Sequence, residues 1–174
     1  MARSEREMSV GPCRHLILMR HAKSDWGDNS LSDHDRPLNR RGMEDAPRIA
    51  AWLEEQDLIP DQIICSSAER TRETVELMLS AWSQQPDWSS DESLYLAPPE
   101  AIVSVIRSGF AGSRILMLVG HNPGWEVTAS LLSGQSLSMT TANVACLTHP
   151  ESDWSGIFQP GTWTLTRLIR PKEL

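Results

Sequence analysis

The chain has 174 residues and a formal net charge of −7 at pH 7, and it contains one Tyr and two Phe beside seven Trp. This length is typical of one domain that buries a core of its own. The negative charge argues against nucleic acid and membranes as partners, because both favour basic proteins. Eight of the 16 Lys and Arg residues nevertheless fall between Arg20 and Arg72. Such clustering suits a local cationic pocket that binds an anion.

The polar residues 1–12 are predicted to form a disordered leader ahead of a single domain at 13–174. They lack the apolar segment of a signal peptide, and no run approaches the ~20 apolar residues of a membrane span. The three cysteines show no metal-type spacing, and Cys65 and Cys146 lie in apolar runs typical of a core. We therefore expect a cytoplasmic protein.

The first half of the chain alternates strands and helices. A short aliphatic run predicts a strand over about 14–20, and the polar stretch 25–37 is expected to be an active-site loop. A helix follows over about 41–56, in which Pro47 sets the start or kinks the axis. A strand at 62–65 then leads into a second helix, for which Ser66 and Glu69 have the spacing of a capping box.

In the second half, 83–91 is predicted to be a polar loop and 92–96 a short strand, followed by a helix from Pro98 or Pro99 to about 108. A strand at 114–119 precedes a helix that begins near Pro123, with Asn122 as its cap. Late strands at 141–148 and 161–169 flank a hairpin loop. The alternation predicts an α/β fold, a three-layer sandwich whose central, mostly parallel sheet carries helices on both faces.

Functional side chains follow three of the predicted strands. One strand ends on Arg20 and His21, another on His121, and Arg70 lies within one helical turn of the strand that ends at Cys65. Carboxyl ends of strands are where open α/β sheets bind ligands, and arginine forks match phosphoryl oxygens. Neighbouring arginines disfavour a protonated His21. We therefore expect phosphate to pass onto His21 and then to water.

Each of these residues also has an ordinary structural explanation. Arg70 alone suits a surface helix, and His121 with Asn122 suits a capping turn; only their joint occurrence favours phosphate chemistry. The remaining histidines lack such neighbours and are expected to be structural. No pair of histidines shows ligand spacing with a carboxylate, so we predict neither a metal nor another cofactor.

The motifs at these strand ends, Arg20-His21, Ser66 with Arg70 and Thr74, and Gly120-His121, resemble those of the histidine phosphatase superfamily. The runs 20–26, 33–38 and 94–100 are similar to its SixA-like phosphohistidine phosphatase branch. The resemblance covers about 14–149 and implies a phosphoglycerate-mutase-like fold.

The resemblance also implies roles for individual residues. By it, His21 accepts the phosphate, and the phosphoryl oxygens are held by Arg20, Arg70 and His121. Arg36 would lie near the pocket mouth, and Asn122 completes the expected substrate-binding set.

One position departs from the superfamily's pattern. Many of its phosphomonoesterases carry a glutamate that protonates the leaving oxygen where this chain has Leu96 and Ala97. Asp25 and Glu100 are weak substitutes on sequence. Imidazole, with a pKa of ~6.5, accepts a proton easily, so a phosphoramidate bond tolerates the missing acid better than an ester. Only 49 positions separate His21 from Arg70 and 51 separate Arg70 from His121, which leaves no room for a large cap.

The favoured expectation is a metal-independent phosphatase that forms a phosphohistidine intermediate on His21 and acts on phosphohistidine in proteins. A phosphomonoesterase on a small phosphorylated metabolite uses the same mechanism and remains the alternative. A non-catalytic module that binds phosphorylated partners is the third, and it would need no nucleophile. The expected partner is thus a phosphorylated protein or a small phosphorylated substrate, with neither nucleic acid nor membrane involved.

Overall fold

The computed structural model describes residues 13–108, 112–151, 153, 154, 156 and 158–174. The predicted leader, 1–12, lies outside the described residues. Two short 3₁₀ turns, Glu92–Leu94 and Pro171–Glu173, accompany the main elements. In chain order these are β1 (Arg14–Arg20), α1 (Arg40–Glu55), β2 (Gln62–Ser66), α2 (Glu69–Ala81), β3 (Asp87–Asp91), α3 (Pro99–Arg107), β4 (Ile115–Gly120), α4 (Gly124–Ser133), β5 (Val144–His149) and β6 (Thr164–Ile169). None of the described helices is both long and apolar enough to cross a membrane.

The strands form one six-stranded sheet in the order β3-β2-β4-β1-β5-β6. β3, β2, β4 and β1 pair in parallel, while β5 runs antiparallel to both β1 and β6. The prediction of a mostly parallel sheet is therefore confirmed, as is the antiparallel late pair, although both of its strands begin about three residues later than expected.

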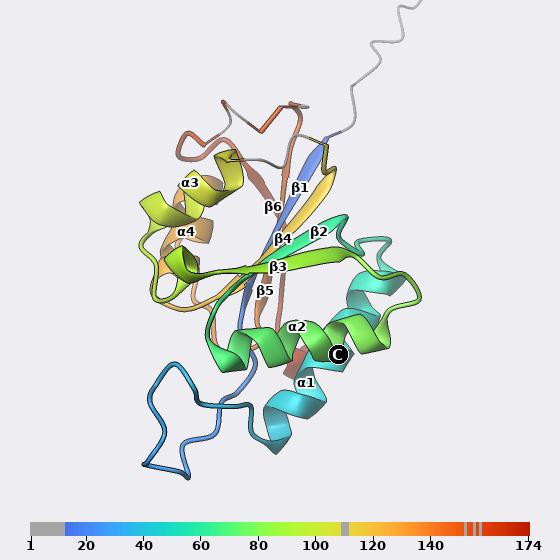
Figure 1. The fold of residues 1–174 in the computed structure, drawn as a ribbon. Coiled ribbons are helices and arrows are strands. Elements are labelled where there is room, and N and C mark those ends of the chain that lie inside the picture. Colours follow the sequence, from blue (N-terminus) through green and yellow to red (C-terminus); the bar gives the residue numbers. More distant parts are fainter. Residues whose placement is uncertain (1–12, 109–111, 152, 155, 157) are drawn as a thin grey trace, which may run out of the picture.

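Helices cover both faces of this sheet, as predicted. Alternation along β1 shows the reason: Leu16 and Leu18 pack with α3 and α4, whereas Ile17 and Met19 pack with α1 and α2. All four side chains are fully buried, since a central strand in a three-layer sandwich has no solvent face. Figure 1 shows the two helix pairs on opposite sides of the sheet.

The strand register brings the predicted site residues to one edge of the sheet. Arg20 at the end of β1 lies opposite Gly120 at the end of β4, and Cys65 of β2 lies opposite Val119. The three parallel strands therefore end level with one another. The residues that follow them emerge side by side at the carboxyl edge, where open sheets bind ligands.

The first helix, α1, agrees with the predicted span of about 41–56 to within one residue at each end. Asn39 caps α1, and its Oδ1 accepts a hydrogen bond from the Gly42 N–H at 2.9 Å. Pro47 lies inside the helix, so the prediction that it sets the start is wrong. The Asn39 cap satisfies a free N–H in the first turn of the helix, and the apolar side chains of α1, among them Ile49 and Leu53, are buried.

Two predicted helix caps are also wrong. α2 begins at Glu69 after Ala68, without a side-chain cap, because Ser66 is still part of β2. The Glu69 N–H instead donates to the His34 carbonyl at 2.9 Å. α4 follows Pro123 without a side-chain cap, and Asn122 Nδ2 donates to the Met139 carbonyl at 2.7 Å and to Glu126 Oε2 at 3.4 Å. Tertiary partners have replaced the local ones.

Between α2 and α3, the strand lies earlier in the chain than predicted. Residues 87–91, expected within a loop, form β3 and pair in parallel with β2. This strand is polar because it lies at the edge of the sheet and is half exposed. The strand expected at 92–96 is a 3₁₀ turn, since Asp91 Oδ1 accepts from the Ser93 N–H at 2.8 Å.

Gly120 tolerates no side chain, because a Cβ there would lie 2.1 Å from the ring of Trp125. We predict that Gly120→Ala lowers the free energy of unfolding by about 1–3 kcal/mol through overpacking, as measured by urea denaturation. Gly112→Ala is the matched control, because a Cβ at that position meets nothing within 4 Å. Equal stability of the two variants would contradict the prediction.

Candidate active site

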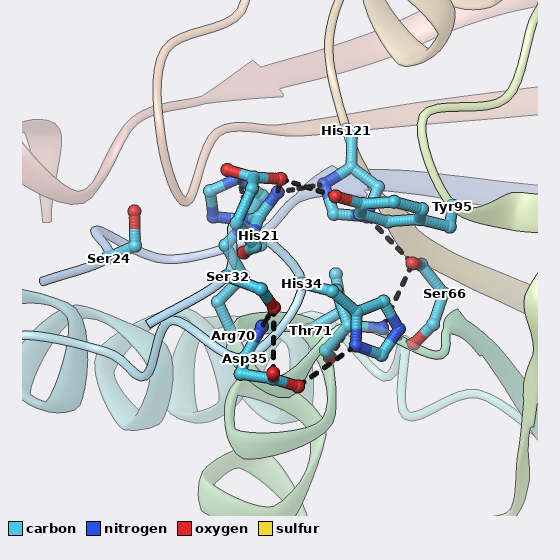
Figure 2. Close-up of polar contacts among 12 residues, drawn as sticks. His21, Ser24, Ser32, His34, Asp35, Ser66, Arg70, Thr71, Tyr95 and His121 are labelled. Carbon is cyan, nitrogen blue, oxygen red and sulfur yellow. Dashed lines mark hydrogen bonds and ion pairs between the residues drawn. The ribbon is translucent and has the colours of Figure 1, made fainter. Parts of the chain in front are cut away.

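His21 follows β1 directly and is held by its neighbours (Figure 2). Its backbone N–H donates to the Gly120 carbonyl at 3.0 Å, and its ring Nδ1 lies 2.7 Å from the Ala22 carbonyl. A carbonyl oxygen only accepts, so Nδ1 carries the proton. The lone pair is then on Nε2, which accepts a hydrogen bond from Arg70 Nε at 3.3 Å. This is the neutral tautomer of a nucleophile.

Arg70 comes from the first turn of α2 and is only 5 % exposed. Its guanidinium lies between two imidazoles: Nε donates to His21, and Nη2 lies 3.3 Å from His121 Nδ1. The loop after β1 also contacts Arg70, because Arg70 Nη1 donates to the Asp33 carbonyl at 2.5 Å. Arg70 is therefore a buried cation fixed at the centre of the site.

His121 follows β4 and has the opposite tautomer. An arginine nitrogen only donates, so His121 Nδ1 is the acceptor, and Nε2 donates to Ser66 Oγ at 2.7 Å. The ring centroids of His21 and His121 are 5.3 Å apart. Ser66, at the end of β2, thus orients one imidazole as the Ala22 carbonyl orients the other.

Both imidazoles are neutral at pH 7. Burial lowers the pKa of His21 to about 4, with Arg70 and Arg20 adding to the effect. Burial is the main cause that lowers the pKa of His121 to about 3, and His21 and Arg70 contribute to this shift. A bound phosphoryl group would reverse part of this balance, because a nearby negative charge favours protonated histidine.

A pocket of about 330 Å³ opens at this edge, and it brings together the predicted residues Arg20, His21, Arg70, His121 and Asn122. Arg20 Nη1 donates to the Met139 carbonyl at 3.1 Å, while its Nε is buried without a hydrogen-bond partner among the described residues. Asn122 Oδ1 is likewise buried without one. The remaining wall consists of Lys23, Ser24, Trp26, Leu96 and Thr141.

Arg36 does not line this pocket itself. Its guanidinium carbon lies 4.2 Å from the centre of the Trp26 ring, and its Nη1 donates to the Asp28 carbonyl at 3.2 Å. Trp26 does line the pocket. The structure thus connects Arg36 to the site through a stacked aromatic ring.

Asp33 and Tyr95 contact the site residues, although sequence reasoning gave neither a role. Asp33 Oδ2 accepts from Arg70 Nη2 at 3.0 Å and from the Tyr95 hydroxyl at 2.5 Å. These two hydrogen bonds, with Tyr95 contributing more, lower the pKa of the Asp33 carboxyl. The Tyr95 ring also meets His121 edge to face at 5.5 Å. The signal in the sequence was indirect: both residues lie in runs that resemble the SixA-like branch, 33–38 and 94–100, and Asp33 also lies in the predicted active-site loop.

The other carboxylates considered from sequence, Asp25 and Glu100, do not line the pocket. Asp25 Oδ1 accepts from the Gly27 N–H at 2.7 Å within its own loop, and Glu100 is in the first turn of α3. Within the described ranges, no three His, Cys, Asp or Glu side chains are grouped as candidate metal ligands.

The neutral imidazoles predict a pH dependence of stability. In the unfolded chain a histidine titrates near 6.5, whereas in the fold the pKa of His21 is about 4 and that of His121 about 3. Between about pH 6.5 and about pH 4 the unfolded state binds more protons, so the free energy of unfolding decreases as pH falls. The contribution is complete above about pH 6.5.

Urea denaturation at several pH values measures this decrease, and the double variant His21→Asn, His121→Asn should show a weaker pH dependence. Titration of the two rings by NMR provides the direct check. Midpoints near 6.5 for both histidines in the folded protein would contradict the prediction.

Comparison with known proteins agrees with this geometry. Residues 16–94 match the model of the histidine phosphatase superfamily, branch 1. An uncharacterized chloroplastic protein of Arabidopsis thaliana is 37% identical over 94% of this chain and 80% of its own length. An uncharacterized protein of Mycobacterium tuberculosis is 34% identical over 80% of this chain and 84% of its own length.

Solved structures show the same fold. A structure provisionally named phosphohistidine phosphatase SixA, from Agrobacterium tumefaciens, has a TM-score of 0.78 and 28% identity, covering 91% of this chain and 98% of that one. The protein histidine phosphatase SixA complexed with tungstate has a TM-score of 0.73 at 20% identity, covering 91% and 98%. The match to the family model, the relatives and the fold agree, and the chain belongs to the histidine phosphatase superfamily.

Proposed function

We propose that this protein is a metal-independent phosphatase that removes phosphate from phosphohistidine in proteins through a covalent intermediate on His21. One observation carries the proposal: the unprotonated Nε2 of a buried, neutral histidine lies 3.3 Å from the Arg70 guanidinium. A nucleophile and an oxyanion donor are thus held together. The likeness to a structure named for phosphohistidine phosphatase activity supports the substrate class.

In the first step, His21 Nε2 attacks phosphorus, and the P–N bond to the substrate imidazole breaks. Arg70 and Arg20 donate to the phosphoryl oxygens, which replaces the role of a metal ion. His121 takes up a proton from solvent at Nδ1 when the dianion binds and donates it in a hydrogen bond to a phosphoryl oxygen. The leaving ring departs as neutral imidazole when its other nitrogen carries a proton, so no enzyme acid is required.

In the second step, water attacks the phosphorus of phospho-His21. The P–Nε2 electrons return to the ring, and the phosphate product releases the proton of water to solvent. The hydrogen bond from His21 Nδ1 to the Ala22 carbonyl keeps Nε2 directed at the same point throughout. This two-step route makes the covalent intermediate the observable that tests the mechanism.

Hydrolysis of a small metabolite's phosphate ester is the second candidate, and Asp33 beside Arg70 is the observation that bears on it. An alkoxide leaving group needs a proton, and a protonated Asp33 would be its donor. However, the hydrogen bonds from Tyr95 and Arg70 lower the pKa of this carboxyl. An ionised Asp33 has no proton to give near pH 7, which favours the phosphohistidine substrate.

His21→Ala is predicted to abolish turnover of a phosphohistidine protein. The wild-type protein, quenched in base during turnover, should carry acid-labile phosphate that is missing in the variant. The variant should keep the fold, because the ring is used for chemistry. Retention of more than a few percent of wild-type activity would rule out the covalent route, and faster hydrolysis of alkyl esters than of phosphohistidine would favour the second candidate.

Arg70→Lys is predicted to lower kcat/KM by on the order of 10²–10³, because lysine cannot donate to two phosphoryl oxygens from a fixed fork. The matched control is Arg72→Lys in the same helix, where the side chain is 46 % exposed and pairs with Glu69. Steady-state kinetics compare the two. Similar small effects at both positions would remove Arg70 from the phosphate site.

A further inference from the structure

We infer that Trp26 and Leu96 form a subsite, here called the ring subsite, that holds a flat leaving group while its phosphoryl group is transferred to His21. This inference rests on the proposed function and deepens it, because it names the part of the substrate that the pocket mouth recognises. Both residues line the same pocket as the catalytic imidazoles. They are 60 % and 56 % exposed, respectively, the two most exposed large apolar side chains among the described residues.

Trp26 is held in place from two directions. Its indole Nε1 donates to Ser24 Oγ at 3.0 Å, and Ser24 is itself buried. The Arg36 guanidinium stacks 4.2 Å from the ring centre and is only 9 % exposed. An aromatic ring fixed in this way loses little conformational freedom when a ligand packs on it. The exposed face of the Trp26 ring is therefore fixed in position before a ligand binds.

The backbone at Leu96 adopts a conformation that is rare for leucine. Its φ angle is +49°, in the left-handed region, which costs free energy and persists only where the surroundings impose it. The neighbours Leu94 and Ala97 are buried. The Ala97 carbonyl packs so closely against Gly124 of α4 that a Cβ on the glycine would lie 1.9 Å away. The fold thus presents an apolar side chain at the pocket.

The direction of the reaction places the leaving group beside these residues. An in-line transfer puts the leaving atom on the side of phosphorus opposite to His21 Nε2. His21 is buried at the base of the pocket, with 7 % of it exposed, so the leaving group lies toward the solvent side, where Trp26 and Leu96 are exposed. Both side chains offer a large exposed apolar area, which packs well against an uncharged ring. The imidazole of phosphohistidine meets this requirement.

Three substrates distinguish the effect of a substitution on the ring subsite from its effect on the phosphate site. Phosphohistidine and p-nitrophenyl phosphate release a flat ring, whereas phosphoramidate releases none. For Trp26→Ala and for Leu96→Ala, we expect the ratio of kcat/KM for each ring substrate to that for phosphoramidate to fall on the order of tenfold. Trp26→Phe should restore most of the ratio. Leu131→Ala is the matched control, because Leu131 is 48 % exposed and lies outside this pocket.

An unchanged ratio in both alanine variants, whether or not the absolute rates fall, would overturn the ring subsite. Failure of the proposed function has a different signature. If wild-type protein hydrolyses p-nitrophenyl phosphate and phosphoramidate but not phosphohistidine, the proposed substrate is wrong. A fall of the p-nitrophenyl phosphate ratio in the variants would then still support a ring subsite.

Discussion

The site depends on one buried guanidinium, that of Arg70, held between two neutral imidazoles. A cation at this depth is stable only when its N–H groups are paired, and here the partners are His21, His121 and Asp33. Burial is the main cause that lowers the pKa of both imidazoles, and Arg70 adds to it because a protonated ring would face a positive charge. A single side chain thus orients both rings, helps to keep them unprotonated and carries the kind of donors that a phosphoryl group requires.

The fold supports this arrangement through residues that do no chemistry. Thr74 Oγ1 accepts from the Ala22 N–H at 3.1 Å and donates to the Arg70 carbonyl at 2.6 Å, so α2 is bonded to the chain that follows His21. Ser66 ties β2 to His121 across the ends of the strands. Because these bonds join separate strand ends at one edge, the geometry of the site depends on the sheet register rather than on any single loop.

The pocket combines a polar base with an apolar rim, and the two serve different parts of a substrate. In the proposed function, Arg20 and Arg70 donate to the phosphoryl group, and in the proposed ring subsite Trp26 and Leu96 pack against the leaving group. No Asp or Glu of the described residues lines this pocket, and Leu96 contributes an apolar side chain to it. An apolar contact without a carboxyl group beside it favours a leaving group that is flat and accepts a proton easily.

Much of the chemistry was predictable from the sequence, because it follows from local patterns. Aliphatic runs that end in Arg20-His21 and in Gly120-His121 identified β1, β4 and the nucleophile, and the strand–helix alternation identified the layers. Local patterns failed where a tertiary partner replaced a neighbour: Ser66 bonds His121 instead of capping α2, and the polar segment 87–91 becomes a strand by pairing with β2. Asp33 and Tyr95 lie 62 positions apart and meet only in the fold. The sequence by itself determined which candidate residues follow the strands, whereas the tertiary structure decided which protons they carry and what surrounds them, because burial and long-range hydrogen bonds exist only after the strands have paired.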